Sequence, residues 1–247
     1  MGKLRVFADR MSQPSRAVLI FCLANEINAE EYFVNLAKGD HRKPEYKSIN
    51  PVGQVPAIDD SGFHLFESHA ILKYLACAHP NIRDHWYPAD LRKRAQLDCI
   101  LDWHHTGLRR GSAGLVMNRV IAPALGRALD PHAAAEAESL LKASLKRMEM
   151  LWLTENGSFL TGSLQPSIAD LSLACEVMQL QLLGKDSVAD LLDPNPKVKN
   201  WLSAVERTLS PHFSQVHETL LKASSMYQKR RERDLKIPMD GPLQSKL

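Results

Sequence analysis

The spacing of apolar residues along the chain changes near residue 80. Before that point the apolar runs are short: residues 4–8 and the segment EEYFVNL have the length and residue types of strands. The segment VPAIDDSGFHLFES predicts two more strands around a Ser61-Gly62 turn. Helical spacing within 18–24 and in SHAILKYLACAH predicts a helix after the first strand and another after the last. The predicted order is therefore βαβ followed by ββα.

From residue 91 onward the apolar spacing is helical almost throughout. It predicts helices over 91 to about 120, 132–154, 167–183, 196–208 and 211–228, with proline or glycine at the breaks. Pro80 and Pro88 bracket an extended polar and aromatic stretch, which is typical of a linker. The chain is thus predicted to comprise an α/β domain (1–80), a linker (81–90), an all-helical domain (91–228) and a C-terminal tail (229–247).

Composition limits the kinds of partner. The 247 residues are 45% hydrophobic, enough for a large core, and 31 basic against 28 acidic residues leave a net charge of only +3. That balance argues against nucleic-acid binding and favours small-molecule substrates. No run approaches the ~18 apolar residues of a membrane span, and the start MGKLRVFADRM lacks the apolar core of a signal peptide. We therefore expect neither a membrane span nor secretion by that route.

Cysteine and histidine spacings predict neither disulfides nor a metal site. The four cysteines are far apart in the sequence, and no two of them have the short spacing of a cysteine pair. This is typical of reduced thiols in an intracellular protein. The ten histidines contain no HExxH, and the adjacent His104 and His105 would point about 100° apart on a helix. No resident metal is therefore expected.

The segment RMSQPSRA, residues 10–17, occupies the first strand-to-helix turn. A βαβ and ββα unit with an X-Pro turn before its third strand indicates a thioredoxin-like domain, whose redox members carry a C-x-x-C pair in this turn. Here the two cysteine positions hold Ser12 and Ser15. This argues against a dithiol oxidoreductase and leaves two interpretations: one serine takes part in chemistry, or both cap the helix.

Several segments in the right order resemble the glutathione transferases. MSQPSRA, NPVGQVPAI and FESHAILKYL resemble the glutathione-binding half of that family, and GSLQPSIADLSLA resembles its helical-domain folding motif. The serine after the first strand, LAKGDHRKPEY and DWHHTGLRRG are similar to the theta class, especially its plant form. The resemblance covers residues 3 to 228. It implies a thioredoxin-like N-terminal domain that binds glutathione, an all-α C-terminal domain that binds the electrophile, and a homodimer that uses glutathione as co-substrate without a further cofactor.

The same resemblance implies two catalytic residues. Ser12 would donate a hydrogen bond to the glutathione thiolate, because a serine hydroxyl is too weak a base to take the thiol proton. Arg109 would reach the sulfur from the helical domain and favour the anion. Arg110, or a plain surface charge, is the alternative to Arg109. Ser15 and Arg16 are interpreted as supporting residues.

The implied glutathione-binding residues lie in three segments. Val55 would pair its backbone with the cysteinyl part beside a cis bond to Pro56; the alternative is an ordinary trans turn. Glu67 would bind the γ-glutamyl ammonium and Ser68 its carboxylate, unless both simply cap a helix. The glycine end would face His41 and Gln54, and Gln54 stands where theta relatives commonly have lysine. Arg42 would replace that charge if it points inward; otherwise it is a solvated surface arginine.

The resemblance implies an enzyme that activates glutathione as a thiolate, conjugates it to electrophiles and reduces organic hydroperoxides. The alternative is a non-catalytic protein of the same fold that binds ligands or protein partners. Thiol-disulfide exchange would need a reactive cysteine such as Cys22. Independently of these activities, Ser167 and Asp170 have the spacing of a helix capping box.

The last three residues, Ser245, Lys246 and Leu247, spell a peroxisomal import signal. They predict binding to the peroxisomal import receptor and a location in the peroxisome, shared with the cytosol. The basic cluster 229–233 is a competing nuclear address, or the solvated end of a helix.

Overall fold

The computed structural model describes residues 3–236 of the chain, with side chains described over 3–230. Ser245, Lys246 and Leu247 lie outside the described residues, so the import signal stays a prediction. Among the described helices, none is both long enough and apolar enough to span a bilayer.

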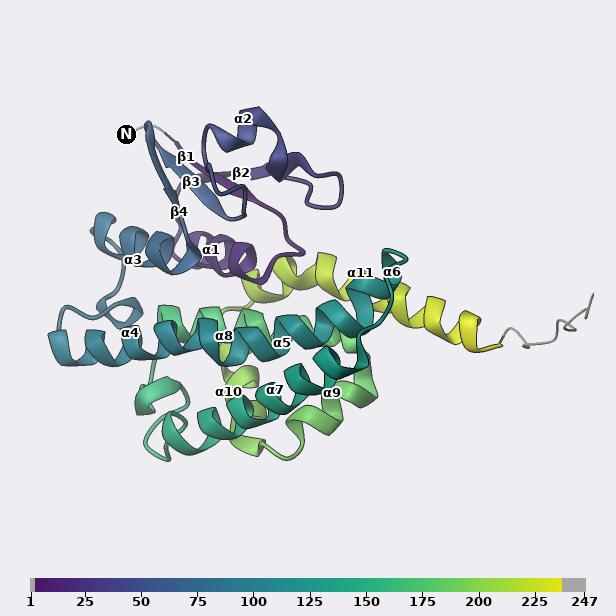
Figure 1. The fold of residues 1–247 in the computed structure, drawn as a ribbon. Helices are drawn as coiled ribbons and strands as arrows, with labels where there is room; N and C mark the ends of the chain where they lie inside the picture. The colour runs from purple at the N-terminus through teal and green to yellow at the C-terminus, as the bar shows by residue number, and fades with distance from the viewer. Residues whose placement is uncertain (1–2, 237–247) are drawn as a thin grey trace, which may run out of the picture.

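A four-stranded sheet forms one end of the molecule (Figure 1). Its strands are β1 (Leu4–Ala8), β2 (Ala29–Phe33), β3 (Ala57–Asp60) and β4 (Phe63–Phe66), in the order β2-β1-β3-β4. β1 is parallel to β2 and antiparallel to β3, and β3 pairs with β4 as a hairpin. The parallel pair needs a crossover, which α1 (Gln13–Ala24) supplies, and α3 (Ser68–Ala78) follows the hairpin. The predicted βαβ and ββα order is confirmed.

The helices α1 and α3 lie between the sheet and the helical part of the chain (Figure 1). α1 is buried over eight consecutive residues, 15–22, because it packs on the sheet and also against the helical part. On the other side of the sheet lie a 3-10 turn (Asp40–Arg42) and the short α2 (Pro44–Lys47), which the apolar spacing did not predict. Four residues are too few to show a helical period.

The rest of the chain is helical, as predicted. It comprises a 3-10 turn (Asp84–Trp86), α4 (Leu91–Thr106), α5 (Leu108–Val116), a π-helical turn (Met117–Ile121), α6 (Ala122–Ala124), α7 (Pro131–Leu151), a 3-10 turn (Leu160–Gly162), α8 (Ile168–Met178), a 3-10 turn (Gln179–Leu183), α9 (Lys185–Leu192), α10 (Pro196–Thr208) and α11 (His212–Lys236).

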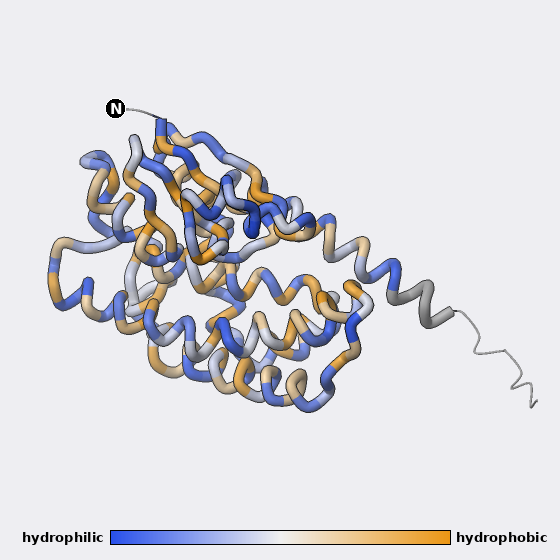
Figure 2. The backbone as a smooth tube through the Cα atoms, turned by 45° about the horizontal axis from the view of Figure 1, so that its top comes forward, coloured by the Kyte–Doolittle hydropathy of each residue, from blue (hydrophilic) through white to orange (hydrophobic). Residues whose placement is uncertain are grey.

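Three details of the helical prediction were wrong. The predicted helix from 91 to about 120 breaks at Gly107, where a Cβ atom would lie 2.5 Å from the Trp103 ring. The eight-residue α9 was missed because it is too short for a clear period. α11 continues to Lys236 instead of ending at 228, since the charged residues after 228 favour a helix even without an apolar face. The last described turns of α11 extend away from the rest of the molecule (Figure 2).

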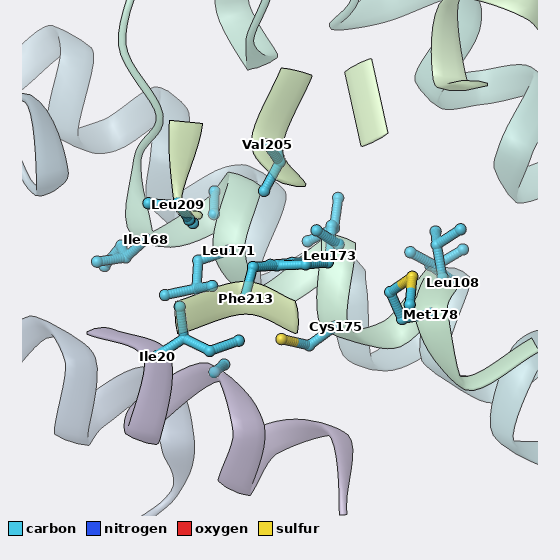
Figure 3. Close-up of a cluster of buried hydrophobic side chains, with 14 of the residues drawn as sticks. Ile20, Leu108, Ile168, Leu171, Leu173, Cys175, Met178, Val205, Leu209 and Phe213 are labelled. Atoms are coloured by element: carbon cyan, nitrogen blue, oxygen red, sulfur yellow. The ribbon is translucent and has the colours of Figure 1, made fainter. Parts of the chain in front are cut away.

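The helix α8 is the centre of the helical core. All eleven of its residues are buried, and α1, α4, α5 and α10 pack around it. Figure 3 shows Ile20 of α1, Val205 of α10 and Phe213 of α11 close to the apolar residues of α8. α8 therefore touches both parts of the chain.

A buried carboxylate fixes the start of α8. Ser167 and Asp170 form the predicted capping box, in which the Ser167 side chain accepts from the Asp170 N–H and the Asp170 carboxylate accepts from the Ser167 N–H at 2.8 Å. Asp170 also accepts hydrogen bonds from the Leu160 N–H and the Trp201 indole N–H, each at 2.8 Å. Burial raises the pKa of Asp170, while these donors act in the opposite direction.

Replacing Asp170 with alanine should strongly destabilise the fold. The buried N–H groups of Leu160, Ser167 and Trp201 would lose their acceptor, and each unsatisfied group costs roughly 1–3 kcal/mol. We expect the free energy of unfolding, measured by urea denaturation, to fall by roughly 3–5 kcal/mol. Asp190→Ala, on the exposed side of α9, is the control and should change it by less than about 0.5 kcal/mol. Equal losses in both variants would contradict this role.

Candidate functional site

Ser12 lies in the turn between β1 and α1, and its hydroxyl makes no hydrogen bond to another described residue. It is the N-cap residue of α1, 9% exposed, and its backbone N–H donates to the Asp9 carbonyl at 2.8 Å. Its side chain makes no capping hydrogen bond, and no other partner for it exists among the described residues. The capping interpretation is therefore wrong for the Ser12 side chain.

Ser15 has a different environment. Its side chain is fully buried, and its Oγ accepts a long, weak hydrogen bond from the Asp9 N–H at 3.5 Å. The Ser15 hydroxyl thus faces the protein interior, which agrees with a supporting role.

Asp9 holds the turn in place, a role the sequence reasoning missed. Its carboxylate accepts from the Met11 N–H at 2.9 Å and from the Leu36 N–H at 3.1 Å. It therefore ties the loop that carries Ser12 to the loop after β2. An acidic residue that directly follows a buried strand was the available signal.

Arg16 connects the same turn to the helical part of the chain. Its guanidinium is fully buried; Nη1 donates to the carbonyls of Arg10 (2.9 Å) and Met11 (3.1 Å). Nη2 donates to the Cys175 carbonyl (3.1 Å) and to Gln179 Oε1 (2.7 Å). Loss of hydration lowers the pKa of Arg16 to about 10, so the group stays cationic at neutral pH.

Glu176, in the middle of α8, is the second residue that the sequence reasoning missed. Its fully buried carboxylate accepts from Gln13 Nε2 at 3.0 Å, from Arg109 Nη1 at 3.1 Å and from the Ser112 hydroxyl. The fourth neighbour is His104, whose Nε2 lies 3.4 Å from Oε2. Burial alone would raise the pKa of Glu176, but these hydrogen bonds and cations outweigh it and lower the pKa to about 2.

Arg109 is thereby brought to the first turn of α1. Its side chain is 34% exposed and shares Glu176 with Gln13, the residue after Ser12. Arg110, the alternative cation, pairs instead with Glu136 at an exposed position. The structure thus places Arg109, and not Arg110, in the cluster that contains Gln13.

Glu67 and Ser68 stand at the start of α3. Glu67 is exposed and has φ 70°, which is uncommon for a residue other than glycine and is often found at ligand sites. Ser68 is 8% exposed and begins the helix, where backbone N–H groups have no helical partner. Neither side chain makes a capping hydrogen bond at this helix start.

A histidine cluster lies directly behind this helix start. The Nε2 atom of His69 is 3.2 Å from His104 Nδ1, and the ring centroids of His69 and His105 are 4.6 Å apart. Burial and the neighbouring cations lower the pKa of His69 to about 2, so it is neutral at physiological pH. Among the residues with described side chains, no group of three or more acidic, histidine or cysteine residues is arranged to hold a metal ion.

The Val55-Pro56 peptide bond is cis, as predicted. The carbonyl of Gln54, just before it, accepts from Asn50 Nδ2 at 2.7 Å and from the Tyr46 hydroxyl. The N–H and carbonyl of Val55 have no hydrogen-bond partner among the described residues. This backbone can therefore pair with an extended peptide, as a strand edge does.

His41, Arg42 and Gln54 form the remaining part of the predicted site. The 3-10 turn that carries His41 touches Gly53, because a Cβ atom there would lie 2.9 Å from the His41 carbonyl. Arg42 is exposed, and its Nε lies 3.2 Å from His41 Nε2. Arg42 is thus a surface arginine, as in the alternative to the inward-pointing one, although its Nε donates to the neighbouring His41 ring. The Gln54 side chain is exposed.

A surface cavity of about 540 Å³ lies away from these residues, at the other end of α1. Its lining includes Asn25, Arg83 and His212 and none of the predicted site residues. The predicted site is therefore defined by its residues and not by this cavity.

Comparison with known proteins identifies the relatives of this chain. The glutathione S-transferase N-terminal domain model matches residues 2–77, and the C-terminal domain model matches residues 131–204. Glutathione S-transferase T1 of Arabidopsis thaliana is 56% identical over 232 residues, 94% of this chain and 95% of that protein. Human glutathione S-transferase theta-1 is 37% identical over 222 residues, 89% of this chain and 90% of its own length.

Comparison with solved structures also finds glutathione transferases of the theta class. The structure of human glutathione transferase theta-2 in complex with glutathione and an unknown ligand superposes with a TM-score of 0.82 at 34% identity. The match covers 97% of this chain and 94% of that one.

The low pKa of Glu176 predicts a specific acid sensitivity. Because the folded-state pKa of about 2 lies below the ordinary 4.5, the carboxylate stabilises the fold above pH 4.5 and loses this effect as pH falls toward 2. Between pH 6 and pH 3, the wild type should lose about 2 kcal/mol more unfolding free energy than Glu176→Gln. Urea denaturation of both proteins at the two pH values measures this. Parallel losses would show that Glu176 titrates normally.

Proposed function

This chain belongs to the theta class of the glutathione S-transferases, and we propose that it activates glutathione as a thiolate through the Ser12 hydroxyl. The observation that carries the proposal is that this hydroxyl has no hydrogen-bond partner among the described residues, although it stands at the N-terminus of a buried helix. A free O–H at this position can donate to a thiolate without first breaking a protein contact.

The free energies expected from these interactions are large enough to lower the pKa of the glutathione thiol. Lowering a thiol pKa from ~8.5 to near 6.5 requires roughly 2.7 kcal/mol of preferential stabilisation of the anion. One charge-assisted hydrogen bond contributes roughly 1.5–3 kcal/mol, and a helix N-terminus about 0.3–1 kcal/mol. In this proposal Arg109 adds a positive charge and acts in the same direction.

Glutathione would lie extended from α3 to the turn before α2. The free N–H and carbonyl of Val55, beside Pro56, would pair with the cysteinyl backbone. The start of α3 would bind the γ-glutamyl carboxylate through Ser68 and its N–H groups, with Glu67 on the ammonium. His41 and Gln54 would face the glycine carboxylate. The glutathione complex of the human theta-2 relative supports this kind of ligand.

Two reactions follow from one thiolate. In conjugation, its sulfur attacks an electrophilic carbon, and the leaving group departs with the bonding pair. In hydroperoxide reduction, the sulfur attacks the terminal oxygen, the O–O bond breaks, and the alkoxide takes a proton to give an alcohol. A second glutathione then attacks the sulfenic sulfur to give the disulfide and water.

The protein's own core thiols are unsuited to these reactions. Burial raises the pKa of both Cys22 and Cys175 to about 12, so neither is a thiolate at neutral pH. This supports glutathione as the nucleophile and argues against exchange through Cys22. We also propose a homodimer, which sedimentation of the 27.7 kDa chain would test.

Ser12→Ala should impair catalysis and thiol activation together. We expect kcat/KM with an organic hydroperoxide to fall roughly 10–100-fold and the pKa of bound glutathione to rise by about one to two, since one charge-assisted hydrogen bond is lost. A coupled peroxidase assay and the ultraviolet absorbance of the thiolate across pH measure these effects. Ser15→Ala is the matched control and should change stability but not that pKa.

Two other results would redirect the proposal. If Ser12→Ala keeps both rate and pKa, the activating group lies elsewhere, and Arg109 is the next candidate. A wild type that binds glutathione saturably but turns over neither hydroperoxides nor alkyl halides would favour a non-catalytic binding protein.

Gln54→Lys should tighten glutathione binding. An added cation at the glycine end would pair with the carboxylate, and an exposed ion pair is worth about 0.2–1 kcal/mol. We therefore expect KM for glutathione to fall by up to about fivefold at unchanged kcat. Gln165→Lys, in an exposed loop next to the distant cavity, adds the same charge elsewhere and should leave KM unchanged. An equal effect of both variants would contradict a local contact.

A further inference from the structure

Glu176 holds two groups that belong to the thiol end of the proposed site. One carboxylate oxygen, Oε1, accepts from Gln13 Nε2 at 3.0 Å, and Gln13 directly follows Ser12. The other, Oε2, accepts from Arg109 Nη1 at 3.1 Å. One buried side chain of α8 therefore contacts the first turn of α1 and the cation of α5.

The geometry leaves Arg109 both anchored and available. Its side chain is 34% exposed, whereas Glu176 is completely buried. Only Nη1 bonds to Glu176, and a guanidinium carries five N–H donors. The other donors have no partner among the described residues and can bind a ligand. A long arginine side chain without such an anchor samples many rotamers, and a fixed partner limits them.

We infer that Glu176 is a positioning residue that fixes the Arg109 guanidinium beside the glutathione sulfur and, through Gln13, the turn that carries Ser12. The inference rests on the proposed function, in which the thiolate forms at Ser12. Glu176 acts through these two residues, so its effect on the thiol follows from where it holds them.

A simple charge effect would act in the opposite direction. A negative charge near the sulfur disfavours a thiolate, so removing it would lower the pKa of the bound thiol. The Glu176 carboxylate faces Arg109 of α5, His104 of α4 and the buried Arg16 of α1. Positioning predicts that removing the carboxylate releases Arg109 and raises the pKa of the thiol. The sign of the change therefore separates the two explanations.

The test compares Glu176→Gln, Arg109→Ala and the double variant, with the pKa of bound glutathione read from thiolate absorbance. We expect each single variant to raise this pKa by about one, a tenfold loss of thiolate below the pKa. The double variant should raise the pKa by less than the sum of the two single effects, because both substitutions remove the Glu176–Arg109 interaction, while the part that Glu176 exerts through Gln13 is lost in addition. An unchanged or lowered pKa in Glu176→Gln, or additive effects, would overturn the inference.

Two further variants separate positioning from stability. Glu149 lies on α7, and its carboxylate accepts from the Lys197 and Val198 N–H groups. Because it contacts neither Arg109 nor Gln13, Glu149→Gln should leave the thiol pKa unchanged. Glu176→Asp keeps the charge but shortens the anchor, so it should raise the thiol pKa even if Glu176→Gln does not fold. No change in Glu176→Asp would then count against positioning.

The two proposals fail in different ways. If the wild type forms no thiolate on binding glutathione, the proposed function fails, and the inference fails with it. If Ser12→Ala and Arg109→Ala raise the pKa of the thiol while both Glu176 variants leave it unchanged, the inference alone is wrong.

Discussion

A charge that is removed from water must be paired, and the carboxylate of Glu176 meets this requirement with groups from three helices. Gln13 comes from α1, His104 from α4, and Arg109 and Ser112 from α5. Through His104 the contacts continue to His69, in the first turn of α3. A continuous set of polar contacts thus runs between the helix starts at Ser12 and Ser68, which would bind the thiol and the γ-glutamyl carboxylate of glutathione. The Glu176 carboxylate, held by α8, therefore links the two helix starts.

α8 carries two fully buried acids with opposite titration behaviour. The partners of Asp170 are neutral N–H and O–H donors, and its pKa is raised because they do not offset the loss of hydration. Glu176 lies near His104 and Arg109, and its pKa is lowered to about 2. Equal burial therefore does not mean an equal role: Asp170 fixes where the helix begins, whereas Glu176 links it to its neighbours.

The periodic parts of the fold were predictable from the sequence, and so was the turn at Ser12. Strand and helix order follows from local spacing, whereas the break at Gly107 depends on how the Trp103 ring packs over it. The partners of Glu176 could not be predicted, because Gln13 and Arg109 lie 163 and 67 residues away in the chain. The available signal was a charged residue in the middle of an apolar helix, which must find a partner.

Arg16 gives the molecule a mechanical property that its two-part architecture does not suggest. Its guanidinium bonds to two carbonyls of the turn before α1 and to two acceptors at the end of α8. Separating the sheet-bearing part from the helical part would break the two Arg16 bonds to the end of α8 and expose the apolar residues packed between α1 and α8. We therefore expect the two parts to unfold in one cooperative transition, so the segment between α3 and α4 serves as a tether rather than a hinge.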